Sequence, residues 1–356
     1  MPVRYAIVGR GWRARFFLRL AALMPDRFAV TAVLTRAHDP SLGVPTVRDL
    51  DALVRDRPDF VITSVPWDAN PGYVAALVDR GLPVLSETPP APDLAGLRAL
   101  WARVGASGLV QVAEQYLLLP GHAARLALVR QGLIGVPTSV QVSSTHLYHA
   151  VSMIRGLLGV DYEPATVHAR AFTAPLADPL TPDGWRRTST VDGLVRDATT
   201  TVATVDFGGR MGLYDFTDNQ WWNPLRTRRI VVRGTRGELV DDRLVRLLSP
   251  DTPVESALVR RQTGHDLNLE GADLDHLSFE GNVVWRNEFF GARLSDEDIA
   301  IATMLARMGC WLDGTGEPPY PLAAACQDHL IGLAIRESVA SGGPVTTGRE
   351  DWVPAA

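Results

Sequence analysis

The first third of the chain alternates between short apolar runs and longer segments with helical spacing. Val3–Val8 is an apolar run of strand length, and Arg15–Met24 follows it with apolar residues at helical intervals. The same alternation predicts further strands at Ala29–Leu34, Phe60–Val65, Pro83–Leu85 and Leu109–Ala113, with helices at Asp49–Arg55, Pro71–Asp79 and Asp93–Val104. Strands that alternate with helices predict a parallel sheet covered by helices on both faces, up to about residue 120.

A glycine-rich string, Gly-Arg-Gly-Trp-Arg-Ala at residues 9–14, separates the first predicted strand from the first helix. In such a turn Gly9 permits the sharp bend, Gly11 lets a pyrophosphate approach the backbone, and Ala14 lets helix and strand pack closely. Trp12 and Arg13 then lie where the start of the helix faces the phosphates. The sequence therefore predicts a Rossmann domain that binds NAD or NADP.

The end of the second predicted strand favours one of these cofactors. It carries Thr35 and Arg36 instead of the Asp or Glu that would accept the ribose 2′-hydroxyl of NAD. A guanidinium can bind a 2′-phosphate bidentately, so NADP is the predicted cofactor. NAD stays the alternative because Asp39 lies nearby, and a solvent-facing arginine at a strand end would give the same sequence.

Beyond residue 120 the pattern changes to a succession of strands. A helix is predicted at Gly121–Gln131, a strand at Ser139–Ser143, a helix at Ala150–Leu158, and a long loop near the crevice at Ala174–Arg187. Further strands are predicted at Val167–Phe172, Asp197–Phe207, Met211–Phe216, Arg229–Gly234, Gly237–Asp241 and Arg243–Leu248, followed by helices at Ile299–Leu312 and Leu322–Ser341. The predicted fold class is α/β. A Rossmann domain spans residues 1–120, and a substrate-binding and oligomerisation α+β domain with a large, mostly antiparallel open sheet spans 121–356.

Composition narrows the function classes. With 46% hydrophobic and 21% charged residues the chain can bury large cores, and a net charge of −5 argues against a nucleic-acid partner. No stretch approaches the roughly eighteen apolar residues of a membrane helix. Met1 leads directly into a strand, so we expect no signal peptide and a cytoplasmic protein. Cys310 and Cys326 are the two cysteines, and we expect both to be buried and reduced.

Four motifs together resemble a known family. They are the glycine turn, residues 59–66 ending in Val65-Pro66, residues 81–89 ending in Glu87-Thr88-Pro89, and residues 132–136. They are similar to motifs of the Gfo/Idh/MocA family, the group of glucose-fructose oxidoreductase and inositol dehydrogenase, and the resemblance covers nearly the whole chain. It implies that Val65, Pro66, Glu87 and Thr88 border the cofactor, and that the last helix returns toward the Rossmann domain.

Two departures from the family pattern bear on the chemistry. The family's Glu-Lys-Pro lysine, which sits beside the nicotinamide and the substrate, falls on Thr88, which carries no positive charge. The family's His-x-x-Asp motif matches His149-Ala-Val-Ser152, so the histidine is kept and the acid is replaced. The imidazole would then have to be held by Tyr148 or by a backbone carbonyl.

Candidate site residues cluster around the predicted loop at residues 145–149. His149, Tyr148 and His146 are the leading acid-base candidates, and Glu114 is a further base or hydroxyl acceptor at the hinge between the domains. The predicted substrate contacts are Tyr116, Trp221 and Trp222, since aromatic rings stack on sugars. His146 and His149, together with Glu114, could alternatively ligate a metal. The spacing of the two histidines does not by itself require a third ligand, and we predict no metal site.

These residues predict an NAD(P)-dependent oxidoreductase that acts on a secondary alcohol of a sugar, cyclitol or sugar-derived metabolite. One alternative is a lyase or epimerase that keeps NAD(P) bound and uses transient oxidation. Another is a non-catalytic sensor of cofactor or sugar on the same scaffold. A large sheet with one uncovered face also predicts a homodimer or homotetramer.

Overall fold

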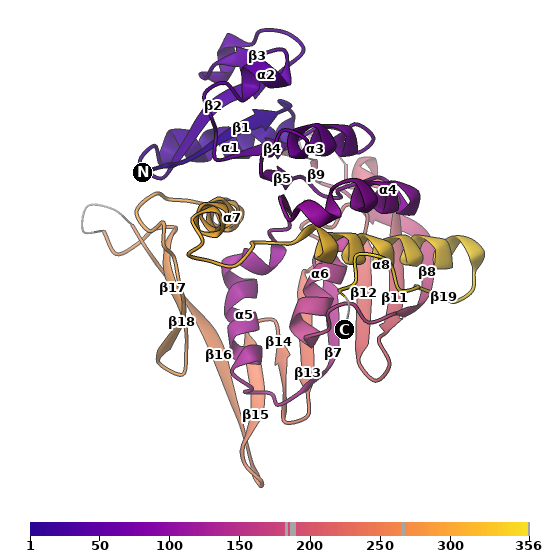
Figure 1. Ribbon diagram of the computed structural model, residues 1–356. Coiled ribbons are helices and arrows are strands. Elements are labelled where there is room, and N and C mark those ends of the chain that lie inside the picture. Colours follow the sequence, from indigo (N-terminus) through magenta and orange to yellow (C-terminus); the bar gives the residue numbers. More distant parts are fainter. Residues whose placement is uncertain (182–183, 186–189, 265–267, 355–356) are drawn as a thin grey trace.

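The protein is described by a computed structural model that covers residues 1–181, 184–185, 190–264 and 268–354. Two large sheets organise these residues, one of six strands and one of eleven (Figure 1). Helices α7 (Asp296–Leu312) and α8 (Leu322–Ser341) lie between the first sheet, at the top of the view, and the second sheet below it. The junction between the sheets is therefore built from segments that are far apart in the sequence.

The six-stranded sheet is entirely parallel, with the order β3-β2-β1-β4-β5-β6. Its strands are β1 (Val3–Val8), β2 (Phe28–Leu34), β3 (Thr46–Val47), β4 (Phe60–Thr63), β5 (Val84–Ser86) and β6 (Val110–Val112), and its helices are α1 (Trp12–Leu23), α2 (Leu50–Leu53), α3 (Asn70–Val78) and α4 (Leu94–Val104). This is the doubly wound Rossmann order, which confirms the predicted fold of the first part. Because the strand order reverses between β1 and β4, a crevice opens at the carboxyl ends of these strands.

The eleven-stranded sheet has the order β18-β17-β16-β15-β14-β13-β7-β12-β11-β8-β19. Its strands are β7 (Pro137–Ser143), β8 (Thr166–Ala177), β11 (Val195–Asp206), β12 (Met211–Thr217), β13 (Arg229–Gly234), β14 (Gly237–Val240), β15 (Arg243–Ser249), β16 (Thr252–Thr263), β17 (Asp273–Phe279), β18 (Asn282–Arg286) and β19 (Val345–Thr346). Only the β7–β12 pair is parallel among the described pairs of this sheet, so the prediction of a mostly antiparallel sheet is confirmed.

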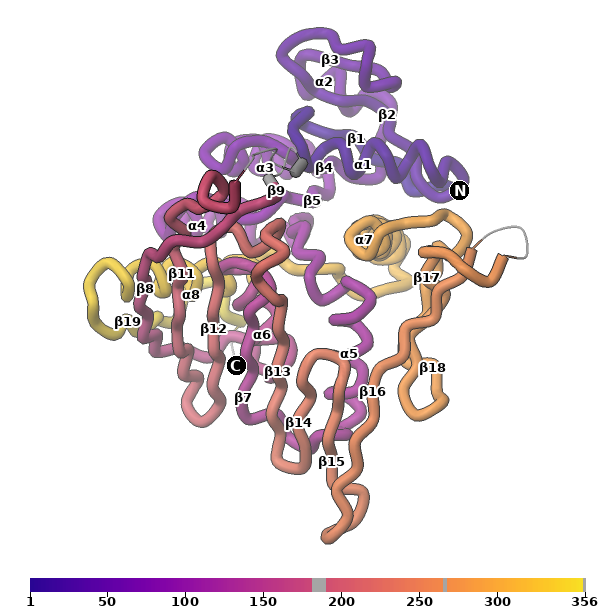
Figure 2. The backbone as a smooth tube through the Cα atoms, turned by 180° about the vertical axis from the view of Figure 1, so that it is seen from behind, coloured from indigo at the N-terminus to yellow at the C-terminus, as the bar shows by residue number. Residues whose placement is uncertain are grey.

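Helices cover one face of the large sheet. Helices α5 (Pro120–Arg130), α6 (Leu147–Leu158) and α8 lie on the side seen in Figure 1. Over the opposite face, seen in Figure 2, no helix lies in the part of the chain that the structure describes. One apolar core joins this helical layer to the α1 side of the Rossmann sheet. A second core fills the other side of the Rossmann sheet and includes Leu322, Ala325 and Cys326 of α8. Helix α8 therefore packs on both sheets.

The structure corrects several predicted elements. The loop predicted at residues 174–187 is wrong, because β8 continues to Ala177 and pairs with β11 there, and the short strands β9 (Leu180–Thr181) and β10 (Gly184–Trp185) follow; residues 182–183 and 186–187 lie outside the described residues. Strands β16 to β18 were not predicted. Cys310 is exposed rather than buried, since it faces away from the buried Met304–Met308 side of α7. None of the described helices is long and apolar enough to cross a bilayer.

Candidate functional site

The glycine turn has the geometry that a dinucleotide needs. Gly9 has φ +104°, and a Cβ there would lie 2.0 Å from the carbonyl oxygen of Ser64 after β4, so only glycine fits between the two strands. Helix α1 begins directly after Gly11, earlier than predicted, and no side chain caps its first N–H groups. Around Gly11 no other atom lies within 4 Å of an added Cβ. The turn therefore offers free backbone donors at an open position, which fits a pyrophosphate.

The residues predicted to contact the ribose of the cofactor follow the carboxyl end of β2. Thr35 is buried and its hydroxyl donates to the carbonyl oxygen of Ala37 at 2.6 Å. Arg36 is exposed. Asp39, because of which NAD stayed the alternative cofactor, forms an ion pair with Arg10 at 2.6 Å and accepts a hydrogen bond from Ser41. Its carboxylate is therefore engaged with the glycine loop, while the Arg36 guanidinium remains accessible.

A buried pair, His149 and Glu114, lies beyond the carboxyl end of β6. Glu114 follows β6, and His149 lies in the first turn of α6, which begins at Leu147 and not at Ala150 as predicted. Imidazole Nδ1 is 2.5 Å from Glu114 Oε2, and both residues are 5% exposed. The sequence suggested Tyr148 or a backbone carbonyl as the support for this imidazole. The structure instead places Glu114 there, so it takes the position of the carboxylate that Ser152 lacks.

Burial favours the uncharged forms of this pair. It raises the pKa of Glu114 to about 8, against the opposing effects of the Tyr116 N–H, the Ser152 hydroxyl and the Arg13 charge. Burial and Arg13 hold the pKa of His149 well below its ordinary value. The two groups therefore titrate as one unit, which shares a single dissociable proton near neutral pH. Since Nδ1 faces Glu114, Nε2 is the nitrogen left for a substrate.

The other two acid-base candidates adjoin the pair but titrate far from neutrality. Burial is the main cause that lowers the pKa of His146 to about 3, and the positive charge of Arg336 adds to it. Burial raises the pKa of Tyr148 above its ordinary value, although a hydrogen bond with the Thr88 side chain opposes this. Their rings lie 5.1 Å and 4.4 Å from that of His149. Both can orient a substrate, but neither matches the proton affinity of the pair near pH 7.

Arg13 was assigned to the cofactor turn, and the structure adds a second role. Its guanidinium is 15% exposed and reaches Glu87 at 3.3 Å and Glu297 at 2.8 Å. Burial alone would lower the pKa of Arg13, but the two carboxylates raise it, so the group stays charged. Arg13 thus supplies a positive charge beside Glu87, although Thr88 replaces the lysine of the family motif. Glu297 was missed by the sequence analysis, which began the helix at Ile299; the acidic run after Ser295 was the available signal.

Aromatic side chains extend the site into the second sheet. The Tyr116 ring lies 4.5 Å from that of His149, and the Trp221 ring lies 4.7 Å from that of His146. Two cavities reach this cluster: one of about 410 Å³ is lined in part by Tyr116, and one of about 450 Å³ in part by His146 and Trp221. Trp222 stacks on Trp221 but lines neither cavity.

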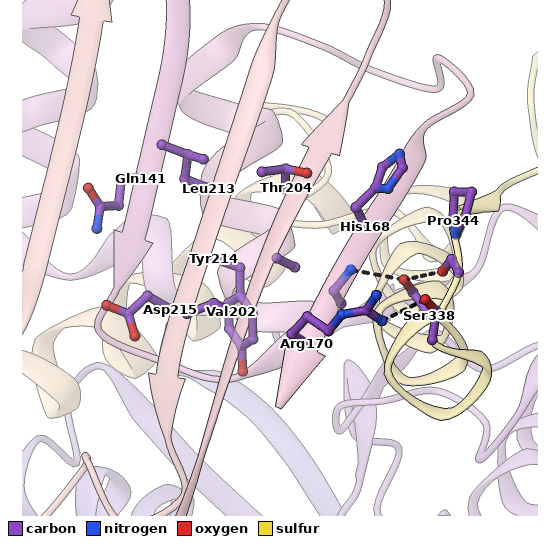
Figure 3. Close-up of a pocket in the computed structure, with 14 residues that line it drawn as sticks. Gln141, His168, Arg170, Val202, Thr204, Leu213, Tyr214, Asp215, Ser338 and Pro344 are labelled. Carbon is purple, nitrogen blue, oxygen red and sulfur yellow. Dashed lines mark hydrogen bonds between the residues drawn. The ribbon is translucent and has the colours of Figure 1, made fainter. Parts of the chain in front are cut away.

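Two further observations concern what surrounds the cluster. In the described ranges no group of three His, Cys, Asp or Glu residues is arranged to hold a metal ion. A separate cavity of about 580 Å³ lies where β8, β11 and β12 meet the end of α8, and Figure 3 shows Arg170 there pointing toward that helix. Arg170 donates to the Gly342 carbonyl at 2.6 Å. None of the candidate catalytic residues lines this cavity.

The fold is that of the Rossmann class of dinucleotide-binding proteins, followed by a large, mostly antiparallel second sheet. Residues 3–115 match the Gfo/Idh/MocA family model, an oxidoreductase family with an NAD-binding Rossmann fold. For the first domain, this match confirms the resemblance seen in the motifs. Comparison with curated protein sequences gives no match.

Solved structures match almost the entire chain at low identity. An oxidoreductase from Agrobacterium radiobacter in complex with NAD⁺, L-tartaric acid and magnesium has a TM-score of 0.67 and 17% identity, over 97% of this chain and 98% of that one. A myo-inositol dehydrogenase from Corynebacterium glutamicum has a TM-score of 0.64 and 18% identity, over 100% of both chains. A levoglucosan dehydrogenase with NADH and levoglucosan has a TM-score of 0.66 and 17% identity, over 97% and 99%. At these identities the likeness concerns the fold.

Proposed function

We propose that this protein is an NAD(P)-dependent oxidoreductase that acts on a secondary alcohol of a sugar, cyclitol or sugar-derived metabolite. The observation that carries the proposal is the buried His149–Glu114 pair at the carboxyl edge of the Rossmann sheet, with Nδ1 and Oε2 2.5 Å apart. The bound nicotinamide supplies hydride transfer. The structural neighbours that bind NAD⁺ with tartaric acid or NADH with levoglucosan support a polyhydroxylated substrate.

The chain's own residues would divide the remaining work. His149 Nε2 accepts the hydroxyl proton when the alcohol is oxidised and returns it in the reverse direction. Glu114 stabilises the proton on the imidazole, so the pair as a whole passes from one negative charge to neutral. Tyr148 and Thr88 orient the reacting hydroxyl, and the burial of His149 and Glu114 limits the access of water to the pair.

NADP is the proposed cofactor, because Arg36 is exposed at the end of β2 and Asp39 is engaged with Arg10. We expect calorimetric titration to give tighter binding of NADP⁺ than of NAD⁺. Arg36→Ala should weaken NADP⁺ binding by about tenfold or more, because it removes a charge-assisted contact, and leave NAD⁺ binding unchanged. The exposed Arg55 offers the control Arg55→Ala. Unchanged NADP⁺ affinity in Arg36→Ala would mean that the 2′-phosphate contact is assigned wrongly.

The function itself is tested by turnover. The purified chain is mixed with NADP⁺ or NAD⁺ and a panel of sugars, sugar acids and cyclitols, and the nicotinamide absorbance is followed. We expect reduction of the nucleotide with at least one member. Nucleotide that copurifies without net turnover would favour the lyase or epimerase alternative, and binding without any chemistry would favour the sensor.

The uncovered face of the large sheet supports a proposed homodimer or homotetramer. Two apolar side chains of this sheet are exposed: Phe172 of β8 is 56% exposed and Val245 of β15 is 41% exposed. Apolar side chains on a helix-free sheet face are typical of an interface between subunits. Light scattering at assay concentration should give a mass at least twice that of the chain, and a monomeric mass would contradict the proposal.

A further inference from the structure

The 410 Å³ cavity next to Tyr116 has a small excess of positive charge, because four arginines and three aspartates line it. It lies between α5 and strands β13, β16 and β17, and its volume is in the range of roughly 300–1,000 Å³ that ligand pockets occupy. Tyr116 lines it and also contacts His149, with ring centroids 4.5 Å apart. A molecule in this cavity is therefore separated from the proton-transfer pair by the width of one aromatic ring.

Most of the charged groups in this cavity are already paired. Arg125, whose side chain is 12% exposed, binds Asp242 at 2.8 Å and donates to the Asp241 carbonyl at 2.6 Å. Arg260 pairs with Asp296. The Asp241 carboxylate accepts the N–H of Ile230 at 2.8 Å. These contacts hold the cavity wall in place without using all of its positive charge.

Arg228 and Arg229 are the two lining arginines that these ion pairs leave over. The Arg228 guanidinium donates to the Trp221 carbonyl at 3.0 Å, and among the described residues no carboxylate lies within ion-pair distance of it. Arg228 and Arg125 both act on His122, which burial and these two charges keep neutral, with a pKa of about 3. The Arg125 guanidinium donates to Nδ1 of the His122 ring at 2.9 Å, so the proton of this neutral ring lies on Nε2. The wall therefore presents N–H donors, and not an acceptor nitrogen, to the cavity.

We infer that this cavity is a subsite for an anionic group of the substrate, a carboxylate or a phosphate, held by Arg228 with Arg125 behind it. This inference rests on the proposed function and narrows its substrate class to acidic sugar derivatives, namely sugar acids or sugar phosphates. The hydroxyl that reacts lies at His149, and the anionic group lies beyond the Tyr116 ring. The second cavity, lined by His146 and Trp221, contains one cation and one carboxylate, Arg336 and Asp218, and has no comparable excess of arginine.

The test compares three probes that share one ring and differ in charge: D-glucuronate, D-glucose 6-phosphate and D-glucose. Calorimetric titration of the full chain, saturated with NADP⁺, should give a lower Kd for at least one acidic probe than for D-glucose. The stronger of the two acids distinguishes carboxylate from phosphate. Arg228→Gln should raise the Kd of that acid by about tenfold or more and leave the Kd of D-glucose unchanged.

Arg226→Gln is the matched control, because Arg226 lies two residues away, is exposed and lines a different cavity, and its guanidinium donates to the neighbouring Leu225 carbonyl. It should leave all three Kd values unchanged. Equal binding of acidic and neutral probes, or an Arg228→Gln variant that binds the acid as well as the wild type does, overturns the subsite. Turnover with neutral polyols alone also overturns it while keeping the oxidoreductase. Arg228-dependent binding of an acid without nucleotide reduction keeps the subsite and overturns the oxidoreductase.

Discussion

Helix α6 carries two buried side chains that face carboxylates, and the two pairs behave differently. His149 faces Glu114, and six residues further on Arg155 faces Asp328 of α8. Arg155 also donates to the carbonyls of Asp161 and Ala324, while Asp328 accepts the Tyr320 hydroxyl. All four side chains are at most 7% exposed. The two pairs are therefore buried to a similar extent, but the His149–Glu114 pair can lose its charges and the Arg155–Asp328 pair cannot.

The difference lies in the cation. Burial would lower the pKa of Arg155, but Asp328 raises it above an already high value, so this pair stays ionic. The pKa of Asp328 rises only to about 6, because Arg155 and Tyr320 counteract burial. The imidazole of His149 can give up its proton, so burial leaves that pair neutral with one proton to exchange. The Arg155–Asp328 ion pair stabilises the packing of α6 on α8, and the His149–Glu114 pair can exchange a proton with a substrate.

The largest effect is expected from His149→Ala. General acid-base catalysis contributes about 100- to 10,000-fold, so kcat should fall by about that factor while NADP⁺ affinity stays unchanged. Thr88→Ala should lower kcat much less, because a threonine hydroxyl only positions the substrate. His276→Ala is the matched control, since His276 on β17 also pairs with a carboxylate, Asp275 at 3.0 Å. Near-normal turnover of a folded His149→Ala variant would place the site elsewhere.

The second effect is on stability and concerns the arginine pair. Arg155→Met leaves the Asp328 carboxylate buried without its partner, so the free energy of unfolding should fall by about 3–5 kcal/mol. Urea denaturation measures this. Arg98→Met removes an ion pair between Glu350 and an arginine whose side chain is 58% exposed, and should lower the free energy of unfolding much less. Equal stabilities of the two variants would show that the buried pair does not fasten the helices.

The smallest effect is a pH dependence of stability that Glu114 causes. Its folded pKa is raised to about 8 from the model-compound value of 4.5, so between these pH values the folded state holds a proton that the unfolded state releases. Stability from this group is present below pH 4.5 and is lost as the pH rises toward 8. Glu114→Gln removes this loss. Its Tm relative to wild type should increase from pH 5 to pH 8, and a constant difference would contradict the raised pKa.

Sequence reasoning reached what is local in this molecule. The glycine turn, its strand and its helix are contiguous, and their spacing predicted the Rossmann domain and the role of Gly9. The pairing of His149 with Glu114 joins residues 35 positions apart and depends on how α6 packs on the end of β6. Strand β16 escaped prediction because charged residues such as Glu255 and Arg260 interrupt its apolar positions. The second role of Arg13 likewise depends on α7, which lies almost three hundred residues away.

The pH dependence of kcat/KM for alcohol oxidation tests the central claim most directly, namely that His149 and Glu114 accept the substrate proton as one unit. With the best substrate of the panel, wild-type kcat/KM should rise with pH through an apparent pKa of about 8, because the pair accepts a proton only after losing its own. In Glu114→Gln this inflection should disappear, and the lower kcat/KM should be independent of pH above neutrality, since the pKa of the remaining imidazole lies well below 6.5. A wild-type profile without an inflection near pH 8, or one that Glu114→Gln leaves unchanged, would contradict the account.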